Sequence, residues 1–467
     1  MSNHIPISKY IILFIPWLLA LLLKDNYILS YLIAWLGSFF LFYISTTGKI
    51  KPLPDDRNIA EQLMRPIFLV QLIFAGYMCC TSIFYFFDVL GYIDFNKVND
   101  SYLIDEEKLN LTAQCQRYYC LAHAAFVSGL FAFMRYPVET KHKYERAGLT
   151  KLIFNMALIT VSLSYFLTFF NGLSQFSHQL RSVSFIAVTL ALAFAIPQNK
   201  IWNILACLVM YGFNFYQALI SGFKEPIILS VLILGLFLYP NYKKTVALTF
   251  IPLLLLLFIV LPTYNRIFRE HAWGGDLNAE DASELALSSV FSQDGTDDSN
   301  WSFLTLRLSE IDMFTKYVQS TPAYVDHYGT QLFRQSLTTI IPRVFWPSKP
   351  ITETMVMERV YNAGVVSRGS RASAKPAFIV DAYLSGGSLG IFISLFIFGA
   401  ACQLIAIRAE KLFGGYILGT ALVFTGLFQA FWRGQSFEFL INTVFWSYIT
   451  MYLIFWTLRF TNILKPI

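Results

Sequence analysis

The chain is short of charge. Of its 467 residues only 14% are Asp, Glu, Lys or Arg, whereas 56% are hydrophobic and 45 are phenylalanine. A soluble globular domain carries about 25% charged residues and has no need of many long apolar runs. This composition excludes an ordinary soluble protein and indicates a membrane protein.

Several chemical signatures are also missing. The chain holds no GxxxxGK[ST] phosphate loop, no HExxH motif and no internal repeat. Its net charge is +6, but no polybasic tail suggests nucleic acid as a partner. The cysteines lack metal-ligand spacing, and we expect them to pack as small apolar side chains without disulfides; they are Cys79, Cys80, Cys115, Cys120, Cys207 and Cys402.

Long apolar runs, in contrast, are abundant. A helix needs about 20 mostly apolar residues to cross a membrane, and this measure predicts about twelve spans. They lie near 9–24, 27–46, 66–90, 117–135, 151–171, 182–198, 201–221, 225–241, 244–262, 377–402, 412–432 and 437–460. The first run has no signal-peptide cleavage site, so we expect it to be a span. The predicted fold is an all-α polytopic membrane protein: helices 1–9 in residues 1–262, a large loop with short helices at 263–376, and helices 10–12 in 377–467.

The short loops predict the orientation of the chain. Lys and Arg are more frequent in the short loops after even-numbered spans than in those after odd-numbered spans. Basic residues of short loops favour the cytoplasmic side. Both termini should therefore be cytoplasmic, and the loop 263–376 should be external. We expect its acidic first part, 271–300, to be mobile and its second part, 301–376, to be ordered.

The predicted external face is rich in cations. They stand in the loop or at the outer ends of membrane helices: Arg181, Lys224, Arg266, Arg307, Arg343, Lys349 and Arg433. Guanidinium groups match phosphate oxygens and stay charged at any relevant pH. Cations at helix ends beside a bilayer cost free energy, which makes each a functional candidate. We predict that the set binds one anionic ligand; the alternative for any single residue is a lipid headgroup or an acidic neighbour.

One stretch of the loop, "TTIIPRVFWPSKPITE" (Thr338–Glu353), combines basic, aromatic and proline residues. Three prolines within nine residues exclude a helix or a central strand and indicate a loop of defined shape. Trp346 can offer a ring face to a sugar, while Arg343 and Lys349 face an anion. The alternative is a lid that packs on the helices.

Candidate general bases are few. Asp381 begins the tenth span and Glu438 begins the last. His327 and His271 lie in the external loop, and His178 lies at the outer end of a helix. A general base must reach the hydroxyl proton that it removes, and spacing alone does not choose among these residues. For both carboxylates, pairing with an arginine is the alternative.

Three blocks of sequence resemble a known family. They are "ISGFKEPIILSVLI" (220–233), "IIPRVFWPSKP" (340–350) and "AKPAFIVDAYLSGGSLG" (374–390), followed by "FWRGQSFEFLINTVFW" (431–446). In this order around one large loop, they are similar to Wzy-type polysaccharide polymerases. Lys224 stands where the family typically has arginine, and Asp381 stands where a glutamate is common.

The resemblance implies a function and an architecture. The fold would be GT-C-like, in the cytoplasmic (inner) membrane of a bacterium. The protein would polymerise undecaprenyl-diphosphate-linked repeat units into an O-antigen- or capsule-type polysaccharide, with inversion. Expected partners are the lipid-linked donor and acceptor glycans, membrane lipid and, as a candidate, a chain-length regulator protein. No cofactor or metal is expected, because the activated donor arrives in the membrane.

Other functions remain as alternatives. An O-antigen ligase has the same fold and donor but transfers the glycan to lipid A-core. A lipid-linked oligosaccharide transporter would show internal repeats and polar residues along the middle of its spans, and we find neither. A structural subunit of an export complex would not need so many convergent arginines.

Overall fold

The protein is mainly helical. A computed structural model describes residues 6–53, 55–57, 59–98, 104–145, 148–170, 174–222, 225–272, 275, 277–291, 301–342, 345–369 and 374–467. The first half contains α1 (Ile7–Leu22), α2 (Tyr27–Thr46), α3 (Ile59–Leu63), α4 (Pro66–Gln71), η1 (Leu72–Cys80), α5 (Ile83–Val89), α6 (Glu106–Phe133), α7 (Leu149–Phe166), η4 (Leu167–Phe169), α8 (Ser174–Ala195), α9 (Ile201–Leu219) and α10 (Glu225–Leu238).

The second half begins with the long helix α11 and ends with a strand. Its elements are α11 (Lys243–Ala272), α12 (Ala279–Phe291), η7 (Phe303–Arg307), α14 (Ile311–Ser320), α15 (Gln331–Ile340), α16 (Thr352–Asn362), α17 (Phe378–Leu412), η8 (Ile417–Phe424), α18 (Thr425–Leu427), α19 (Ala430–Arg433), α20 (Phe437–Phe460) and β4 (Lys465–Pro466). Two short antiparallel ladders pair β1 (Tyr92–Ile93) with β2 (Asn96–Lys97), and β3 (His142–Lys143) with β4.

The protein is a membrane protein by the length and composition of its helices. Among the described residues, six helices are long and apolar enough to cross a membrane: Tyr27–Thr46, Pro66–Val89, Leu149–Phe169, Phe176–Ala195, Phe378–Leu412 and Phe437–Phe460. Large apolar side chains also cover outward faces; Trp202, Val209 and Leu248 are 83%, 74% and 79% exposed. Such faces are stable against hydrocarbon rather than water.

Every predicted span coincides with helical structure, and several of these helices extend beyond the predicted bounds of the span. Helix α6 begins at Glu106 because the Asp105 carboxylate accepts a hydrogen bond from the Lys108 N–H (3.1 Å) and caps the helix. Helix α11 continues to Ala272, and α17 to Leu412. Apolar contacts with α12 extend α11, whereas α17 continues because its terminal charged residues are bound by neighbouring segments. Hydropathy alone therefore underestimates the length of these helices, because it does not detect their polar ends.

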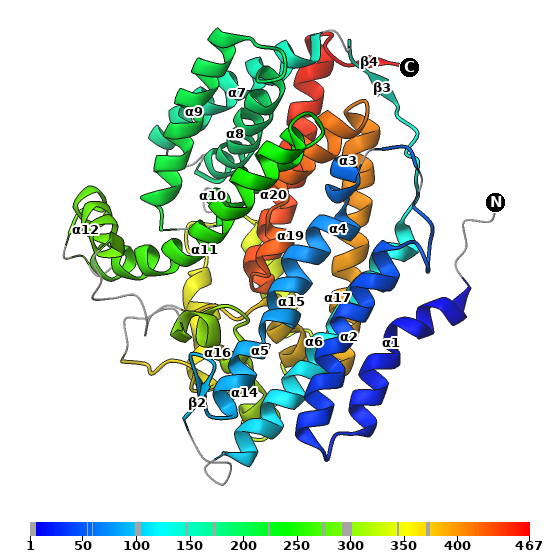
Figure 1. The fold of residues 1–467 in the computed structure, drawn as a ribbon, viewed down its shortest axis with the longest axis vertical. Coiled ribbons are helices and arrows are strands. Elements are labelled where there is room, and N and C mark those ends of the chain that lie inside the picture. Colours follow the sequence, from blue (N-terminus) through cyan, green and yellow to red (C-terminus); the bar gives the residue numbers. More distant parts are fainter. Residues whose placement is uncertain are drawn as a thin grey trace.

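Part of the acidic segment 271–300, which the sequence predicts to be mobile, is helical in the structure. Ala279–Phe291 forms α12, which packs Ala282 and Ala286 against Tyr264 and Phe268 of α11. Figure 1 shows this helical hairpin projecting from the side of the bundle. The small residues of α12 allow the close packing of the two helices.

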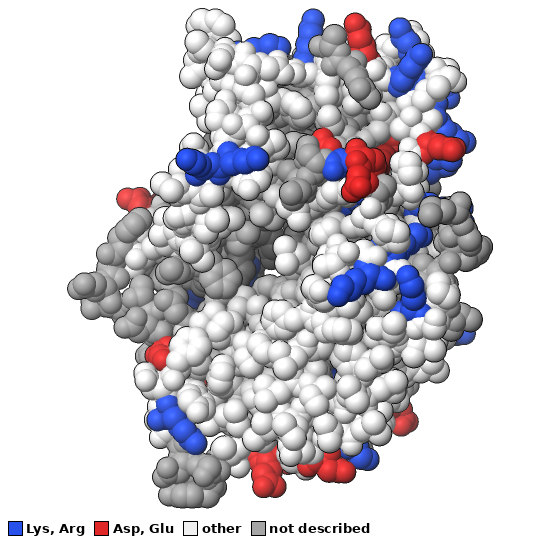
Figure 2. Space-filling model, turned by 45° about the vertical axis from the view of Figure 1, so that its right-hand side comes forward, with Lys and Arg blue, Asp and Glu red and all other residues white. Residues whose placement is uncertain are grey.

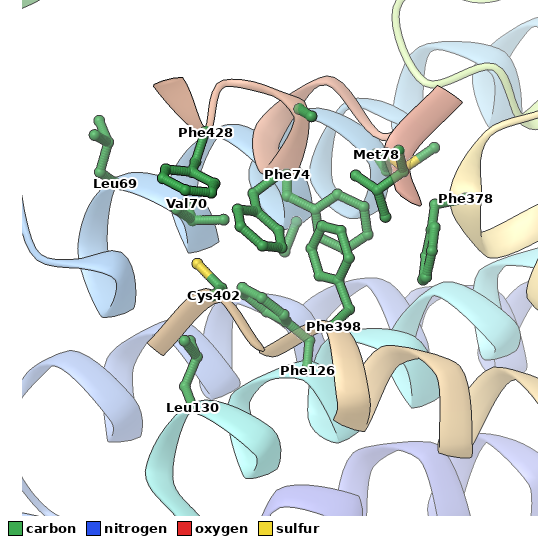
Figure 3. Packing of buried hydrophobic residues seen from close by; sticks show 14 of the residues in the cluster. Leu69, Val70, Phe74, Met78, Phe126, Leu130, Phe378, Phe398, Cys402 and Phe428 are labelled. Atoms are coloured by element: carbon green, nitrogen blue, oxygen red, sulfur yellow. The ribbon is translucent and has the colours of Figure 1, made fainter. Parts of the chain in front are cut away.

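Helices α6 and α17 form the centre of the bundle. A Cβ atom added to Gly129 of α6 would lie within 3.0 Å of the α17 backbone, and one added to Gly399 of α17 would equally strike α6 at Phe126. Glycines thus bring the two backbones together, as is common between membrane helices. Beside this contact, the Phe398 ring lies 4.8–5.6 Å from the rings of Phe74, Phe126, Phe378 and Phe431 (Figure 3).

Helix α17 is broken near its beginning. Gly386 and Gly387 leave the helical conformation, and Gly387 has φ = 59° and ψ = −140°, a region open essentially to glycine. The break frees the Leu384 carbonyl, which accepts a hydrogen bond from the Tyr328 N–H (2.9 Å). The short first part of α17 is therefore held by the loop between α14 and α15.

Charged side chains gather toward both ends of the bundle. The short helices α14 and α16 and the strand β2 lie in the lower half of Figure 1, while β3 and β4 lie at the upper end and α3 lies in the upper half. Figure 2 shows charged side chains along the lower rim and over the upper part of one face, with a wide uncharged area just above the lower rim. An uncharged area between charged regions agrees with helices that cross a membrane.

Candidate functional site

A cavity of about 570 Å³ lies between the ends of several helices of the bundle. Its walls are the end of α7, the start of α8, the end of α9, the start of α10, the region of α18 and α19, Lys375 and the start of α20. We call it the polar cavity. The lining residues on which the argument depends are Tyr165, His178, Gln179, Arg181, Asn214, Gln217, Lys375, Gln429, Gln435, Asn442 and Trp446.

The polar cavity is positively charged. Arg181 and Lys375 line it, and no acidic residue is found among the described lining residues. Within the described part of the chain, no carboxylate pairs with Arg181; Lys375 lies 3.3 Å from the Glu353 carboxylate and 4.2 Å from the centre of the Phe439 ring. A concave wall of one charge sign raises the local concentration of ligands of the opposite sign. The cavity therefore favours an anion.

The remaining walls combine amides with aromatic rings. Gln179, Gln217, Gln435 and Asn442 offer both hydrogen-bond donors and acceptors. Asn442 also has a buried Oδ1 atom without a hydrogen-bond partner in the described structure. Because buried polar atoms normally have a partner, this atom is a position at which a ligand or water can donate a hydrogen bond.

The predicted acids Asp381 and Glu438 lie beside the cavity in a buried ionic cluster. Both carboxylates are fully buried, and both bind Arg359 of α16, which is only 2% exposed. The Arg359 Nε and Nη2 atoms donate to Asp381 (2.8 and 2.9 Å), and Nη1 and Nη2 donate to Glu438 (2.9 and 2.7 Å). The second Asp381 oxygen also accepts the Phe437 N–H at the start of α20 (2.8 Å). One arginine thus joins α16, α17 and α20.

The two carboxylates stabilise the charged form of Arg359 despite its burial. Burial by itself lowers the pKa of the guanidinium, but the Asp381 and Glu438 carboxylates outweigh burial and hold the pKa above its usual range. Asp381 and Glu438 do not line the polar cavity. Their observed contacts match the pairing alternative, and their catalytic role stays a prediction.

The proline-rich loop places Lys349 against a helix end. Its ammonium group donates to the carbonyls of Thr339 (2.7 Å) and Ile341 (2.9 Å). The Trp446 indole N–H donates to the intervening carbonyl of Ile340 (3.2 Å). Carbonyls at the C-terminus of a helix lack helical partners, so these donors cap α15. Lys349 and Trp346 lie outside the lining of the polar cavity, and their ligand contacts stay predictions.

The other predicted residues are separated in space. His327 is exposed, stacks edge to face with Tyr383 (5.7 Å between ring centres) and lies beside the Gly387 break. Arg266 is exposed on α11 and does not line the cavity. Lys224 and Arg343 lie outside the described residues, and the side chains of Arg307 and Arg433 are likewise not described.

The polar cavity nevertheless unites regions that the sequence singled out. Arg181 lines it directly, Ser221 and Pro226 flank Lys224, and Gln429 and Gln435 flank Arg433. Sequence reasoning missed Arg359 as the partner of both carboxylates and overlooked the amides. The sequence did contain a signal for the amides, because glutamine and asparagine residues stand beside cations at several apolar helix ends.

Comparison with known proteins assigns a family. The model of a domain of unknown function, DUF8712, matches residues 15–466. The chain belongs to the DUF8712 family. No curated protein and no solved structure matches it. The match covers the bundle from α1 to β4, so the polar cavity and the ionic cluster both belong to the DUF8712 domain.

Proposed function

We propose that this DUF8712 protein is a membrane glycosyltransferase that polymerises undecaprenyl-diphosphate-linked repeat units into a surface polysaccharide. The observation that carries the proposal is the polar cavity, with its cations, amides and aromatic rings. Cations suit a diphosphate, amides suit sugar hydroxyls, and aromatic rings suit the apolar faces of sugar rings. A lipid-linked glycan presents all three chemical features together.

The proposal includes the topology. Twelve helices cross the inner membrane of a bacterium in a GT-C-like arrangement, both termini are cytoplasmic, and the segment 263–376 is periplasmic. The start of α20, which is one wall of the polar cavity, is bound to α16 through Arg359 and Glu438, so the proposal places the cavity on the same periplasmic side as the segment 263–376. A lipid-linked substrate can reach such a site sideways from the outer leaflet.

In the proposed reaction an acceptor hydroxyl oxygen attacks the anomeric carbon of the donor glycan. The bond from this carbon to the diphosphate oxygen breaks, and the configuration is inverted in a single displacement. Arg181 and Lys375 stabilise the negative charge that grows on undecaprenyl diphosphate, and such preorganised charges act most strongly in the transition state. His178, which lines the same cavity, takes the hydroxyl proton.

The cellular test uses a strain that lacks the gene. Its surface glycan is resolved by size and probed for attachment to lipid A-core. The proposal expects glycan capped at one repeat unit. Long polymer left on undecaprenyl diphosphate would instead identify an O-antigen ligase and overturn the proposal.

The molecular test compares cavity and control variants in the same strain. Arg181→Gln should lower the rate of polymer formation about 100-fold, the effect of removing one preorganised charge. Arg334→Gln removes an equal charge from an exposed position of α15 outside the cavity lining and should leave polymerisation unchanged. Equal activity of both variants at equal membrane abundance would contradict a role for the cavity.

A further inference from the structure

A second cavity, of about 480 Å³, lies at the opposite end of α7 from the polar cavity. Lys143, Lys151 and Lys465 line it, together with Asn155 and Glu145. We call it the lysine cavity. The last turn of α7 contributes Ser164 and Tyr165 to the polar cavity, whereas its first two turns contribute to the lysine cavity.

The lysine cavity concentrates unneutralised positive charge. Lys143 and Lys465 are direct partners across the two-residue ladder of β3 and β4. Like charges directly opposite each other destabilise a strand pair. Across the described parts of the chain none of the three lysines forms an ion pair, and the single acidic residue in the described lining, Glu145, is exposed. An anion in the cavity would relieve this repulsion.

One face of α7 changes from polar to apolar as it leaves the lysine cavity. Lys151 and Asn155 line the cavity, and Leu158 and Ile159 follow on the same face, 50% and 60% exposed. The segment Leu149–Phe169 is long and apolar enough to cross a membrane, so this face meets hydrocarbon. A soluble anion would contact only the lysines. An anionic lipid would contact both the polar and the apolar part of this face.

We propose that the lysine cavity binds the phosphate-bearing headgroup of an anionic phospholipid, whose acyl chain lies against Leu158 and Ile159. Lysine ammonium groups form charge-assisted hydrogen bonds with phosphate. The bound lipid holds β3, β4 and the start of α7 together. This proposal is independent of the proposed glycosyltransferase activity, because the two cavities lie at opposite ends of α7.

The experiment measures thermal unfolding of the full-length protein in neutral detergent during titration with phosphatidylglycerol. The test variant carries Lys143→Gln, Lys151→Gln and Lys465→Gln. The matched control carries Lys200→Gln, Lys243→Gln and Lys244→Gln, which remove the same charge from exposed lysines outside the cavity.

Phosphatidylglycerol should raise the Tm of the wild type and the control, whereas phosphatidylcholine should not. Each lysine beside an anionic lipid strengthens binding about fivefold, so the half-saturating concentration should rise roughly 100-fold in the test variant. Without lipid, the test variant should be at least as stable as the wild type, since the Lys143–Lys465 repulsion is gone.

Three results would overturn the proposal. An unchanged lipid response of the test variant would show that the lysine cavity is not the site at which the lipid binds. An equal Tm increase with inorganic phosphate alone would identify a soluble anion as the ligand. A lower Tm of the lipid-free test variant would show that the lysines stabilise the fold itself.

Discussion

The two ends of α17 each carry a buried carboxylate, and each is held in a different way. Asp381 in the first turn shares Arg359 with Glu438, so that one cation serves two anions. Glu410 in the last turn binds Arg57, which also lies near Asp56 (3.7 Å). The first end therefore depends on a single guanidinium group.

The Glu410 end has a second arginine and two aromatic supports. Arg65, which is fully buried, binds Asp56 (2.8 Å) and lies 4.0 Å from the centre of the Tyr136 ring. Arg57 lies 4.6 Å from the centre of the Tyr416 ring. Two cations thus face two anions, and cation–π contacts add to the attraction.

The two ends of α17 differ in whether a second cation remains when one arginine is removed. Removing one partner from a buried ion pair leaves an uncompensated charge, and its cost exceeds the net contribution of the intact pair. At the Asp381 end the loss of one arginine would leave two like charges close together. At the Glu410 end a second arginine remains. The following predictions test this contrast.

Arg359→Met should produce the largest effect. It leaves Asp381 and Glu438 buried without a cation, and breaking a buried pair costs about 3–5 kcal/mol of unfolding free energy. Thermal unfolding in detergent measures the change. The double variant Arg359→Met/Glu438→Gln should recover part of the loss, because one buried charge is gone. A loss below about 1 kcal/mol in the single variant would contradict the dependence on Arg359.

Gly399→Ala should follow, because it separates α17 from α6 between the two clusters. The added Cβ would collide with the α6 backbone at Phe126, and such overpacking costs about 1–3 kcal/mol. Gly212→Ala is the matched control, since nothing lies within 4 Å of a Cβ added there. Equal stability of the two variants would show that α6 and α17 do not depend on close approach.

Arg57→Met should destabilise less than Arg359→Met, by about 1–2 kcal/mol. Glu410 would keep the hydrogen bond from the Thr420 hydroxyl (2.9 Å), and Arg65 would remain beside Asp56. The same unfolding experiment compares the two arginines directly. If Arg57→Met costs as much as Arg359→Met, redundancy does not explain the difference between the ends.

The smallest expected effect is a pH dependence of the unfolding free energy. It is caused by His142, which lies near the Glu410 end of α17. Burial, then Arg459 and Lys141, lower the pKa of this imidazole from its ordinary value of 6.5. A lowered pKa means that the folded state binds the proton more weakly than the unfolded chain does. The contribution of the neutral His142 to the unfolding free energy is therefore fully present above about pH 6.5 and is lost as the pH falls below that value.

The measurement compares Tm values at pH 7.5 and 5.5. His142→Phe keeps a ring against Phe455, whose centre lies 4.9 Å away, but cannot titrate. The wild type should lose more Tm on acidification than this variant. Parallel pH profiles of the two proteins would rule out His142 as the cause.

Much of the helical fold was predictable from local patterns, and the errors were local as well. Hydropathy located every candidate span but ended α11 and α17 about ten residues early, because polar extensions carry no hydropathy signal. For the candidate site, the cations at helix ends singled out Arg181, which lines the polar cavity. They also singled out Lys224 and Arg433, whose neighbours in the chain line it. The prediction did not separate Lys349, which caps α15, from Arg181, which lines the cavity.

The sequence by itself determined that this is a helical membrane protein with charge collected at the ends of its helices. Apolar length and loop charge are local properties, so they are readable without the fold. Only the tertiary structure decided which charges meet. Arg359 lies 22 residues from Asp381 and 79 from Glu438, and either acid had several arginines as possible partners. Helix packing made that choice, since a buried charge is stable only beside the partner that packing brings within a few ångströms.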